Sequence, residues 1–483
     1  MGGLAAGIYG QLNGYDTSIF EQHYSPGGQC ASWRRKGYTF DGCIHHLFGC
    51  AEGSHVYEFW KEIGAMPREL APTSECVSVA APDGTMFYDY WDLERLQDHL
   101  KELAPADAAP IEEYVRAIPS FARTDFTGEA VLGSRLRLAT MAPRMIPMLK
   151  WLKPTMEEYA AKFRDPFMRR AFPLLEYSIP YSPYFLHLVK HAYAINKDIA
   201  WPVGASHEFA GSIAKKYRDY GGSIHYRQRV ARILTEGGRA VGIRLEDGTE
   251  ERADVVVSNA DGRKTIMGLL DGQYTDARIR EWCAEPDDET NWAVHVFLGV
   301  DRDLSSEPSA MVQLLDQPVR VAGQTADSIE MQMFGFDPTM APEGKGTIKV
   351  ELFSKYSYWK ELYQDRPRYD EEKEKVASTV IEILERTHFP GITAQVEVVD
   401  VPTLMTWERY VGGTHGFISG PKKDFRAGDL LLGHLNSTLP GLERFHLVGT
   451  WATAAGALFL NAKSGRTVVR DICRRDGRKF TTR

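Results

Sequence analysis

Apolar and small residues recur at helical spacing at the start of the chain. Those able to share one helix face are Leu4, Ala5, Ile8 and Leu12. The small residues Ala6 and Gly7 would let this helix approach a sheet closely. Asn13-Gly14 is a helix stop, because both residues tolerate the left-handed conformation. Residues 17–20 then suit a short strand that ends at Glu21. The opening therefore predicts a helix followed by a strand.

The middle of the chain carries a longer patterned run. Ser206 is placed to cap a helix, and the glycine pair at 221–222 ends it. The apolar stripe of this helix is formed by Phe209, Ile213 and Tyr217. Two alternating runs, 230–234 and 240–245, predict a hairpin, and residues 254–257 predict a buried parallel strand.

The last patterned segment lies near the carboxyl end of the chain. Residues 445–448 predict a short buried strand, which a turn of small residues and a long helix follow. Between the patterned segments, residues from about 75 to 200 are mainly helical in pattern. Residues from about 290 to 420 alternate strand-like runs with a helix at 369–386. These regions predict a mixed α+β part outside the strand–helix–strand pattern.

Composition narrows the class of protein. A chain of 483 residues with 43% hydrophobic content can bury a large core, and a net charge of −8 argues against a nucleic-acid surface. Six cysteines without framework spacing suit a reducing compartment. We find no signal-peptide pattern and no apolar run of about 20 residues that could span a membrane. We therefore expect a cytoplasmic protein.

The first residues match part of a dinucleotide-binding fingerprint. Gly3 fits the third glycine of G-x-G-x-x-G, where the first helix packs on the sheet, and Glu21 fits the acid that binds the ribose hydroxyls. The first strand and the earlier glycines of that motif have no counterpart, so we expect a start that lacks a central strand and weak retention of cofactor. The alternative is a surface helix that begins with small residues.

The segment after Glu21 contains Pro26-Gly27-Gly28 and then Tyr38-Thr39-Phe40-Asp41-Gly42. With these residues it resembles the phytoene desaturase family of flavoproteins, which includes carotenoid isomerases and retinol saturases. Glycines suit this position, because the backbone must pass close to a flat cofactor. Gln29 stands where the family usually has Arg, and Cys43 where Pro is common. The middle block that ends in Ser258-Asn259-Ala260-Asp261 and the block at 439–472 continue the resemblance over nearly the whole chain.

The resemblance implies a fold and a cofactor. We expect an α/β protein whose glutathione-reductase-type Rossmann domain binds FAD and is formed by residues 1–75, 200–290 and 420–483. Residues 76–199 and 291–419 would form the discontinuous substrate domain. The residues implied to contact FAD are Gly2, Gly3, Glu21, Gln22, Gly27, Gly28, Gln29, Val230, Gly449, Ala455 and Gly456. The helix after Gly449 would present N–H groups to the flavin pyrimidine.

Three residues are candidates for a catalytic role. His45 follows the Phe-Asp-Gly turn, where family members approach the isoalloxazine. Arg409 and Tyr410 belong to a Glu-Arg-Tyr-x-Gly run that resembles the family's approach to the cofactor; the alternative for Arg409 is a structural ion pair with a core carboxylate. The metal-like cluster of Cys43, His45, His46 and Cys50 lacks the spacing of a tetrahedral site, so we predict no metal.

The expected reaction is hydride transfer between flavin and a long apolar polyene or isoprenoid, as desaturation, saturation or isomerisation. Two alternatives are an amine-oxidase-like flavoenzyme and a non-catalytic binding protein of the same fold. Residues 141–159 combine apolar side chains with Arg144, Lys150 and Lys153. They suit a lid helix over an internal pocket, or an interfacial helix that attaches the protein to a membrane face. The pattern leaves the oligomeric state open.

Overall fold

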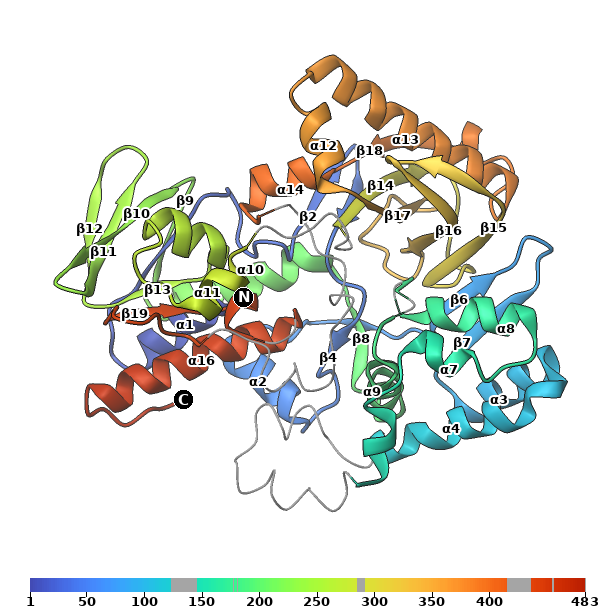
Figure 1. Cartoon of the computed structure of the whole chain (residues 1–483), viewed down its shortest axis with the longest axis horizontal. Coiled ribbons are helices and arrows are strands. Elements are labelled where there is room, and N and C mark those ends of the chain that lie inside the picture. The colour runs from blue at the N-terminus through green and yellow to red at the C-terminus, as the bar shows by residue number, and fades with distance from the viewer. Residues whose placement is uncertain are drawn as a thin grey trace.

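The computed structural model describes residues 1–122, 146–176, 178–179, 181–284, 292–414, 436–453 and 456–482. Two short parallel strand pairs lie beside the first helix. The elements are α1 (Gly2–Leu12), β1 (Ser18–Glu21) paired with β9 (Ser223–Tyr226), and β13 (Val256–Ser258) paired with β19 (Phe445–Leu447). The start, middle and end of the chain thus meet around α1, as Figure 1 shows.

Helix α1 packs against the C-terminal helix α16 (Leu458–Arg475) (Figure 1). The two backbones approach very closely: a Cβ atom at Gly465 would lie 2.3 Å from the carbonyl oxygen of Gly2. Leu4, Ile8 and Phe459 are buried in the same core. The helical stripe predicted for the opening is confirmed, and glycine is required where the helices cross.

The middle block forms a helix and an antiparallel sheet. They are α10 (Ala205–Asp219), β10 (Val230–Glu236), β11 (Arg239–Leu245) and β12 (Glu250–Arg252). The predicted hairpin is confirmed, but the predicted cap is wrong. Gly204 occupies the N-cap position and Ser206 lies in the first turn. Ser206 instead donates its backbone N–H and its hydroxyl to the carboxylate of Asp41.

A large mixed sheet joins two distant stretches of the chain, and seven described strands belong to it. In spatial order they are β18 (Val396–Asp400), β14 (Trp292–Val300), β17 (Gly346–Ser354), β16 (Gln324–Met333), β15 (Ala310–Val321), β6 (Glu75–Ala80) and β7 (Met86–Tyr90). β15 and β6 are parallel, whereas the other pairs are antiparallel. Helices α12 (Tyr356–Leu362), α13 (Arg366–Arg386) and α14 (Leu404–Val411) pack near one end (Figure 1).

Helices gather at the β6–β7 end of this sheet (Figure 1). They are α3 (Leu93–Leu103), α4 (Ala108–Ala122), α7 (Met156–Ala160), α8 (Pro166–Ala171) and α9 (Tyr184–Ile195). Their core includes Tyr114, Phe172 and Leu188. The remaining described strands and α-helices are β2 (Ser32–Arg35), β3 (Tyr38–Asp41), β4 (Leu47–Phe48), β5 (Leu70–Ala71), β8 (Ile199–Pro202), α2 (His55–Ile63) and α11 (Ala277–Trp282). The division into two domains stays a prediction.

The segment considered for a lid or a membrane contact is described from residue 146 onward. Residues 146–151 form a short 3₁₀ helix. Trp151 is buried, so it is not available to an interface, whereas Ile146 and Leu149 are exposed. Lys150 lies over the Trp151 ring. Among the described helices, none is long and apolar enough to cross a membrane.

Candidate functional site

Gly2 and Gly3 lie against the ends of two distant strands. A Cβ atom at Gly2 would lie 2.5 Å from Asn259 Oδ1 and 2.8 Å from the backbone nitrogen of Gly449. The backbone N–H of Gly3 donates to Asn259 Oδ1 at 2.5 Å. Asn259 follows β13, and Gly449 follows β19. The N-terminus of α1 thus meets the carboxyl ends of both strands, which is where open α/β sheets bind ligands.

Gly449 has a backbone that suits glycine alone. Its φ of 84° and ψ of −159° fall in a region that L side chains rarely adopt. Its N–H donates to the hydroxyl of Ser464 at 2.8 Å. The carbonyl of Gly456, farther along, accepts from the Asn461 side chain at 3.4 Å. Ala455 lies outside the described residues. This turn from strand to helix keeps the backbone bare beside Gly2.

Glu21 stands at the end of β1 as a half-buried carboxylate. Its Oε1 accepts the backbone N–H of His23 at 2.8 Å. Burial raises the pKa of Glu21, and the nearby ammonium of Met1 opposes this rise. The carbonyl of Glu21 accepts the N–H of Gln228, two residues before Val230. Glu21, Val230 and the start of α1 are therefore neighbours.

The loop after Glu21 lies near the Met1 ammonium, which interacts with Cys30 at the end of this loop. We call the region around Gly2, Glu21, Gly28 and Gly449 the cofactor groove. Gly27 has a φ of 117°, and a Cβ atom there would lie 2.3 Å from the carbonyl oxygen of Cys30. Gly28 has a φ of 64° and no atom within 4 Å of its Cβ position, so its outer side is open. Gln29 is half-buried. The Gln22 side chain donates to the carbonyl of Tyr410 at 3.3 Å.

The two catalytic candidates on α14 are exposed. The Tyr410 ring lies 5.8 Å from that of His23, edge to face. The Arg409 guanidinium lies 5.4 Å from the Tyr410 ring. Its neighbour Glu408 accepts hydrogen bonds from Lys264 and Tyr356. Arg409 and Tyr410 therefore lie at the edge of the loop that carries Gln22, and their catalytic role stays a prediction.

Asp41 has a role that sequence reasoning missed. Its carboxylate is fully buried and accepts the N–H groups of Cys43 and Ile44 at 2.9 Å each. It also accepts the backbone N–H and the hydroxyl of Ser206. Burial raises its pKa, and these hydrogen bonds oppose the rise. Asp41 thus holds the Phe-Asp-Gly turn against the first turn of α10. The position of Asp41 within that turn was the sequence signal that could have indicated this role.

His45, which is half-buried, contacts a buried group of polar residues on the seven-stranded sheet. We call His45 and that group, which consists of His295, Glu330, Lys349 and Glu351, the sheet cluster. Lys349 Nζ donates to His45 Nε2 at 3.2 Å, and His295 Nε2 lies 3.1 Å from Glu351 Oε2. Glu330 faces Glu351 across β16 and β17. Only His45 of the five is a predicted site residue.

The sheet cluster has strongly shifted acid–base properties. Burial and then repulsion from Glu351 raise the pKa of Glu330 to about 8. Burial and then the charge of Lys349 hold the pKa of His45 well below its usual value. Lys349 is also within electrostatic range of Cys43, which in turn is near the Met1 ammonium. The cluster therefore begins beside the groove lined by Gly2 and Glu21.

The groove fits a nucleotide cofactor. Its wall is backbone at Gly2, Gly28 and Gly449, where a side chain would collide or strain the chain. The N-terminus of α1 offers the N–H groups and the positive dipole end that favour a diphosphate. The carboxylate of Glu21 can accept hydroxyl donors. The N–H donors and the carboxylate acceptor are groups that suit the diphosphate and the ribose of a dinucleotide.

The family described as "Flavin containing amine oxidoreductase" matches residues 1–473. The chain belongs to this family. It is a flavin-dependent oxidoreductase, and the FAD cofactor and the α/β flavoprotein fold that the resemblance implied are confirmed. The two glycine turns and Glu21 are the parts of this chain available to hold the cofactor, and those individual contacts stay predictions.

The relatives of this flavoprotein have low sequence identity to it but match most of its length. A neurosporene-forming phytoene desaturase from Rhodobacter capsulatus is 24% identical over 83% of this chain and 79% of its own. A chloroplastic prolycopene isomerase from Daucus carota is 24% identical over 86% of this chain and 70% of its own. The predicted relation to phytoene desaturases and carotenoid isomerases is confirmed.

Solved structures agree on the fold. An oxidoreductase from Methanosarcina mazei has a TM-score of 0.59 at 17% identity. The match covers 97% of this flavoprotein and 98% of the other chain. A putrescine oxidase has a TM-score of 0.58 at 12% identity, with 98% and 97% covered. These likenesses concern the fold alone.

Proposed function

We propose that this flavoprotein transfers hydride between FAD and a long apolar polyene or isoprenoid, as phytoene desaturases do. The observation that carries the proposal is the meeting of Gly2, Glu21 and Gly449 at one groove, in a chain whose relatives include phytoene desaturases and a prolycopene isomerase. Bound flavin supplies the two-electron redox chemistry. Desaturation, saturation and isomerisation all use this arrangement.

The protein's own residues have three tasks in this proposal. Glu21 accepts the ribose hydroxyls, and the bare backbone at Gly2 and Gly449 lets the cofactor lie close to the N-terminus of α1. N–H groups at the start of α16 stabilise negative charge on the pyrimidine edge. Orientation of the substrate chain against the ring provides most of the remaining rate enhancement.

An anaerobic mixing experiment tests the proposal. The purified, FAD-loaded protein is mixed with phytoene or a retinoid in detergent micelles, both with oxidised and with dithionite-reduced flavin, and the visible flavin absorbance is followed. Bleaching of oxidised flavin identifies a desaturase, and reoxidation of reduced flavin identifies a saturase. A change in polyene geometry without net flavin change identifies an isomerase. No reaction with any polyene in the flavin-loaded protein contradicts the proposal.

One observation favours an amine or another polar substrate as the second candidate. The sheet cluster places Lys349, Glu351 and Glu330 in the interior near Cys43, and a hydrocarbon needs no such groups. Buried charges are costly unless they serve a pair or a function. In this case amines, and not polyenes, bleach the flavin, and Lys349→Met lowers that rate. The exposed Lys355→Met, just after the same strand, is the matched control.

A further inference from the structure

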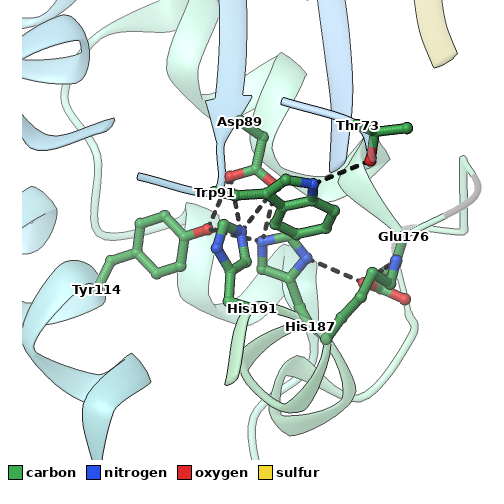
Figure 2. Close-up of polar contacts among 8 residues, drawn as sticks. Thr73, Asp89, Trp91, Tyr114, Glu176, His187 and His191 are labelled. Carbon is green, nitrogen blue, oxygen red and sulfur yellow. Dashed lines mark hydrogen bonds and ion pairs between the residues drawn. The ribbon is translucent and has the colours of Figure 1, made fainter. Parts of the chain in front are cut away.

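A second group of buried polar residues lies away from the groove, where the β6–β7 hairpin packs against helix α9. This hairpin–helix cluster consists of Cys76, Asp89, Tyr114, Glu176, His187, Lys190 and His191. Figure 2 shows Tyr114, His187 and His191 pointing toward the carboxylate of Asp89, with Glu176 on the far side of His187. Every member is at least nine-tenths buried.

Four potential metal ligands in this cluster converge. His187 and His191 are one helical turn apart, so they project from the same face of α9. Cys76 and Asp89 come from the two strands of the hairpin. Atoms of Cys76, Asp89 and His187 all lie within 4.8 Å of one another, and His191 Nε2 is 3.0 Å from Asp89 Oδ2. A hairpin that offers two ligands and a helix that offers H-x₃-H is an arrangement used for structural zinc.

The hydrogen bonds of His187 call for a cation on its inner side. Its Nδ1 lies 2.9 Å from Glu176 Oε1, and a carboxylate only accepts, so Nδ1 carries a proton. In a neutral ring, Nε2 then has only its lone pair. That lone pair faces Asp89 Oδ2 at 3.5 Å and the Tyr114 hydroxyl at 2.8 Å.

Tyr114 cannot satisfy both neighbours. It has one proton, and Asp89 Oδ1 accepts at 2.8 Å. The lone pair of His187 Nε2 and the carboxylate of Asp89 would then repel across a dry core unless a proton or a metal ion lies between them. A carboxylate on the outer nitrogen of a histidine is also the usual support of a metal-bound imidazole.

We propose that Cys76, Asp89, His187 and His191 bind a structural Zn²⁺ ion. Ligand atoms at 2.0 to 2.3 Å from zinc in a tetrahedron are roughly 3.3 to 3.7 Å apart. The ligand atoms of Cys76, Asp89 and His187, which lie within 4.8 Å of one another, would draw closer together, and the His191 ring would turn toward the same point. One thiolate, two imidazoles and one carboxylate suit zinc better than a hard cation. Four protein ligands leave no open position, so the ion staples the hairpin to α9. Glu176 orients His187. The ammonium of Lys190, whose Nζ lies 2.7 Å from Glu176 Oε1, balances the charge of the Glu176 carboxylate.

Metal content and cobalt spectroscopy test this site. The full chain is purified without chelator, its zinc is measured by plasma mass spectrometry, and the metal-free protein is titrated with Co²⁺. We expect about one zinc per chain and a tetrahedral cobalt spectrum with a thiolate charge-transfer band. Glu176→Gln should weaken cobalt binding about 10- to 100-fold, as loss of a supporting hydrogen bond does. Cys76→Ser should remove the charge-transfer band.

A cysteine outside the hairpin–helix cluster provides the control. Cys283→Ser removes another buried cysteine, which lies in a different core, and should leave the spectrum unchanged. If Cys76→Ser does not fold, X-ray absorption at the cobalt edge of the wild-type protein reports sulfur and imidazole in the shell instead. A folded wild-type protein that binds no Co²⁺, or binds it without sulfur, overturns the proposal and leaves a proton on His187. The test is independent of flavin and of the proposed reaction.

Discussion

The cofactor groove consists mainly of backbone, whereas the hairpin–helix cluster consists of polar side chains. The groove is made of bare backbone at Gly2, Gly28 and Gly449, with one carboxylate, Glu21. The cluster is made of side chains that carry charge or bind protons, all sealed from water. In a groove open to solvent, water can form the hydrogen bonds of polar groups when no ligand is bound. Polar groups in a buried cluster must form their hydrogen bonds within the protein.

This contrast separates two kinds of dependence. Loss of the Glu21 side chain should weaken cofactor binding and leave the folded chain intact, because solvent replaces the missing partner. Loss of a cluster residue should destabilise the fold, because the remaining partners stay buried without it. The sheet cluster around Lys349 lies between these cases, since it is buried but begins beside the groove.

The largest effect is expected at Asp89. Asp89→Ala removes the carboxylate that Tyr114 and His191 contact, and breaking such a buried arrangement costs about 3–5 kcal/mol. Chemical denaturation measures this as a lower free energy of unfolding. Asp83→Ala, at the exposed turn of the same hairpin, should leave the free energy of unfolding nearly unchanged. Equal effects of the two variants would show that the cluster does not hold the fold.

The second effect concerns cofactor affinity. Glu21→Ala should weaken FAD binding roughly 10- to 100-fold, because a hydrogen bond to a charged group contributes about 1.5–3 kcal/mol. Fluorescence titration of free flavin into the apoprotein measures it, with unfolding followed in parallel. Asp16→Ala, an exposed acid just before β1, is the control. A Glu21 variant with unchanged affinity would remove this residue from the cofactor site.

The third effect is a pH dependence from the sheet cluster. The pKa of Glu330 is raised to about 8, so the folded protein holds its proton where the unfolded chain, with a usual value of 4.5, releases it. The proton on Glu330 therefore contributes fully to the free energy of unfolding below pH 4.5. That contribution is lost as the pH rises toward 8, by at most about 1.4 kcal/mol per pH unit. Denaturation at several pH values should therefore show a steeper decline for the wild type than for Glu330→Gln.

The Glu330→Gln variant should also be the more stable protein above pH 8, since its amide never becomes charged. Glu361→Gln, an exposed acid on α12, should follow the wild-type curve. Parallel curves for the wild type and Glu330→Gln would mean that Glu330 is not protonated in the folded state.

The smallest effect is expected on the surface sheet near the groove. Arg244 and Glu250 form an exposed ion pair at 2.7 Å across β11 and β12. Arg244→Ala should cost no more than about 1 kcal/mol, because water and salt screen such pairs. A loss as large as that at Asp89 would erase the distinction between exposed and buried charges drawn above.

The elements of the groove were predictable because each rests on local signals. The helix at residues 2–12, the strand ending at Glu21 and the meander from Val230 follow from apolar spacing and glycine turns. The cap at Ser206 was predicted wrongly because its hydroxyl serves a distant carboxylate, Asp41, and Gly204 begins the helix instead. Short-range rules cannot include a partner that is 165 residues away.

The sequence by itself determined the helices and strands of an α/β protein, since backbone conformation and apolar period depend on neighbouring residues. Its resemblance to phytoene desaturases implied the flavin. Only the tertiary structure decided which polar side chains share an interior. Cys76, Asp89 and His187 have ordinary surroundings in the chain and meet only when the hairpin packs on α9. Burial then governs their chemistry, because the cost of an unpaired polar group depends on the solvent it has lost.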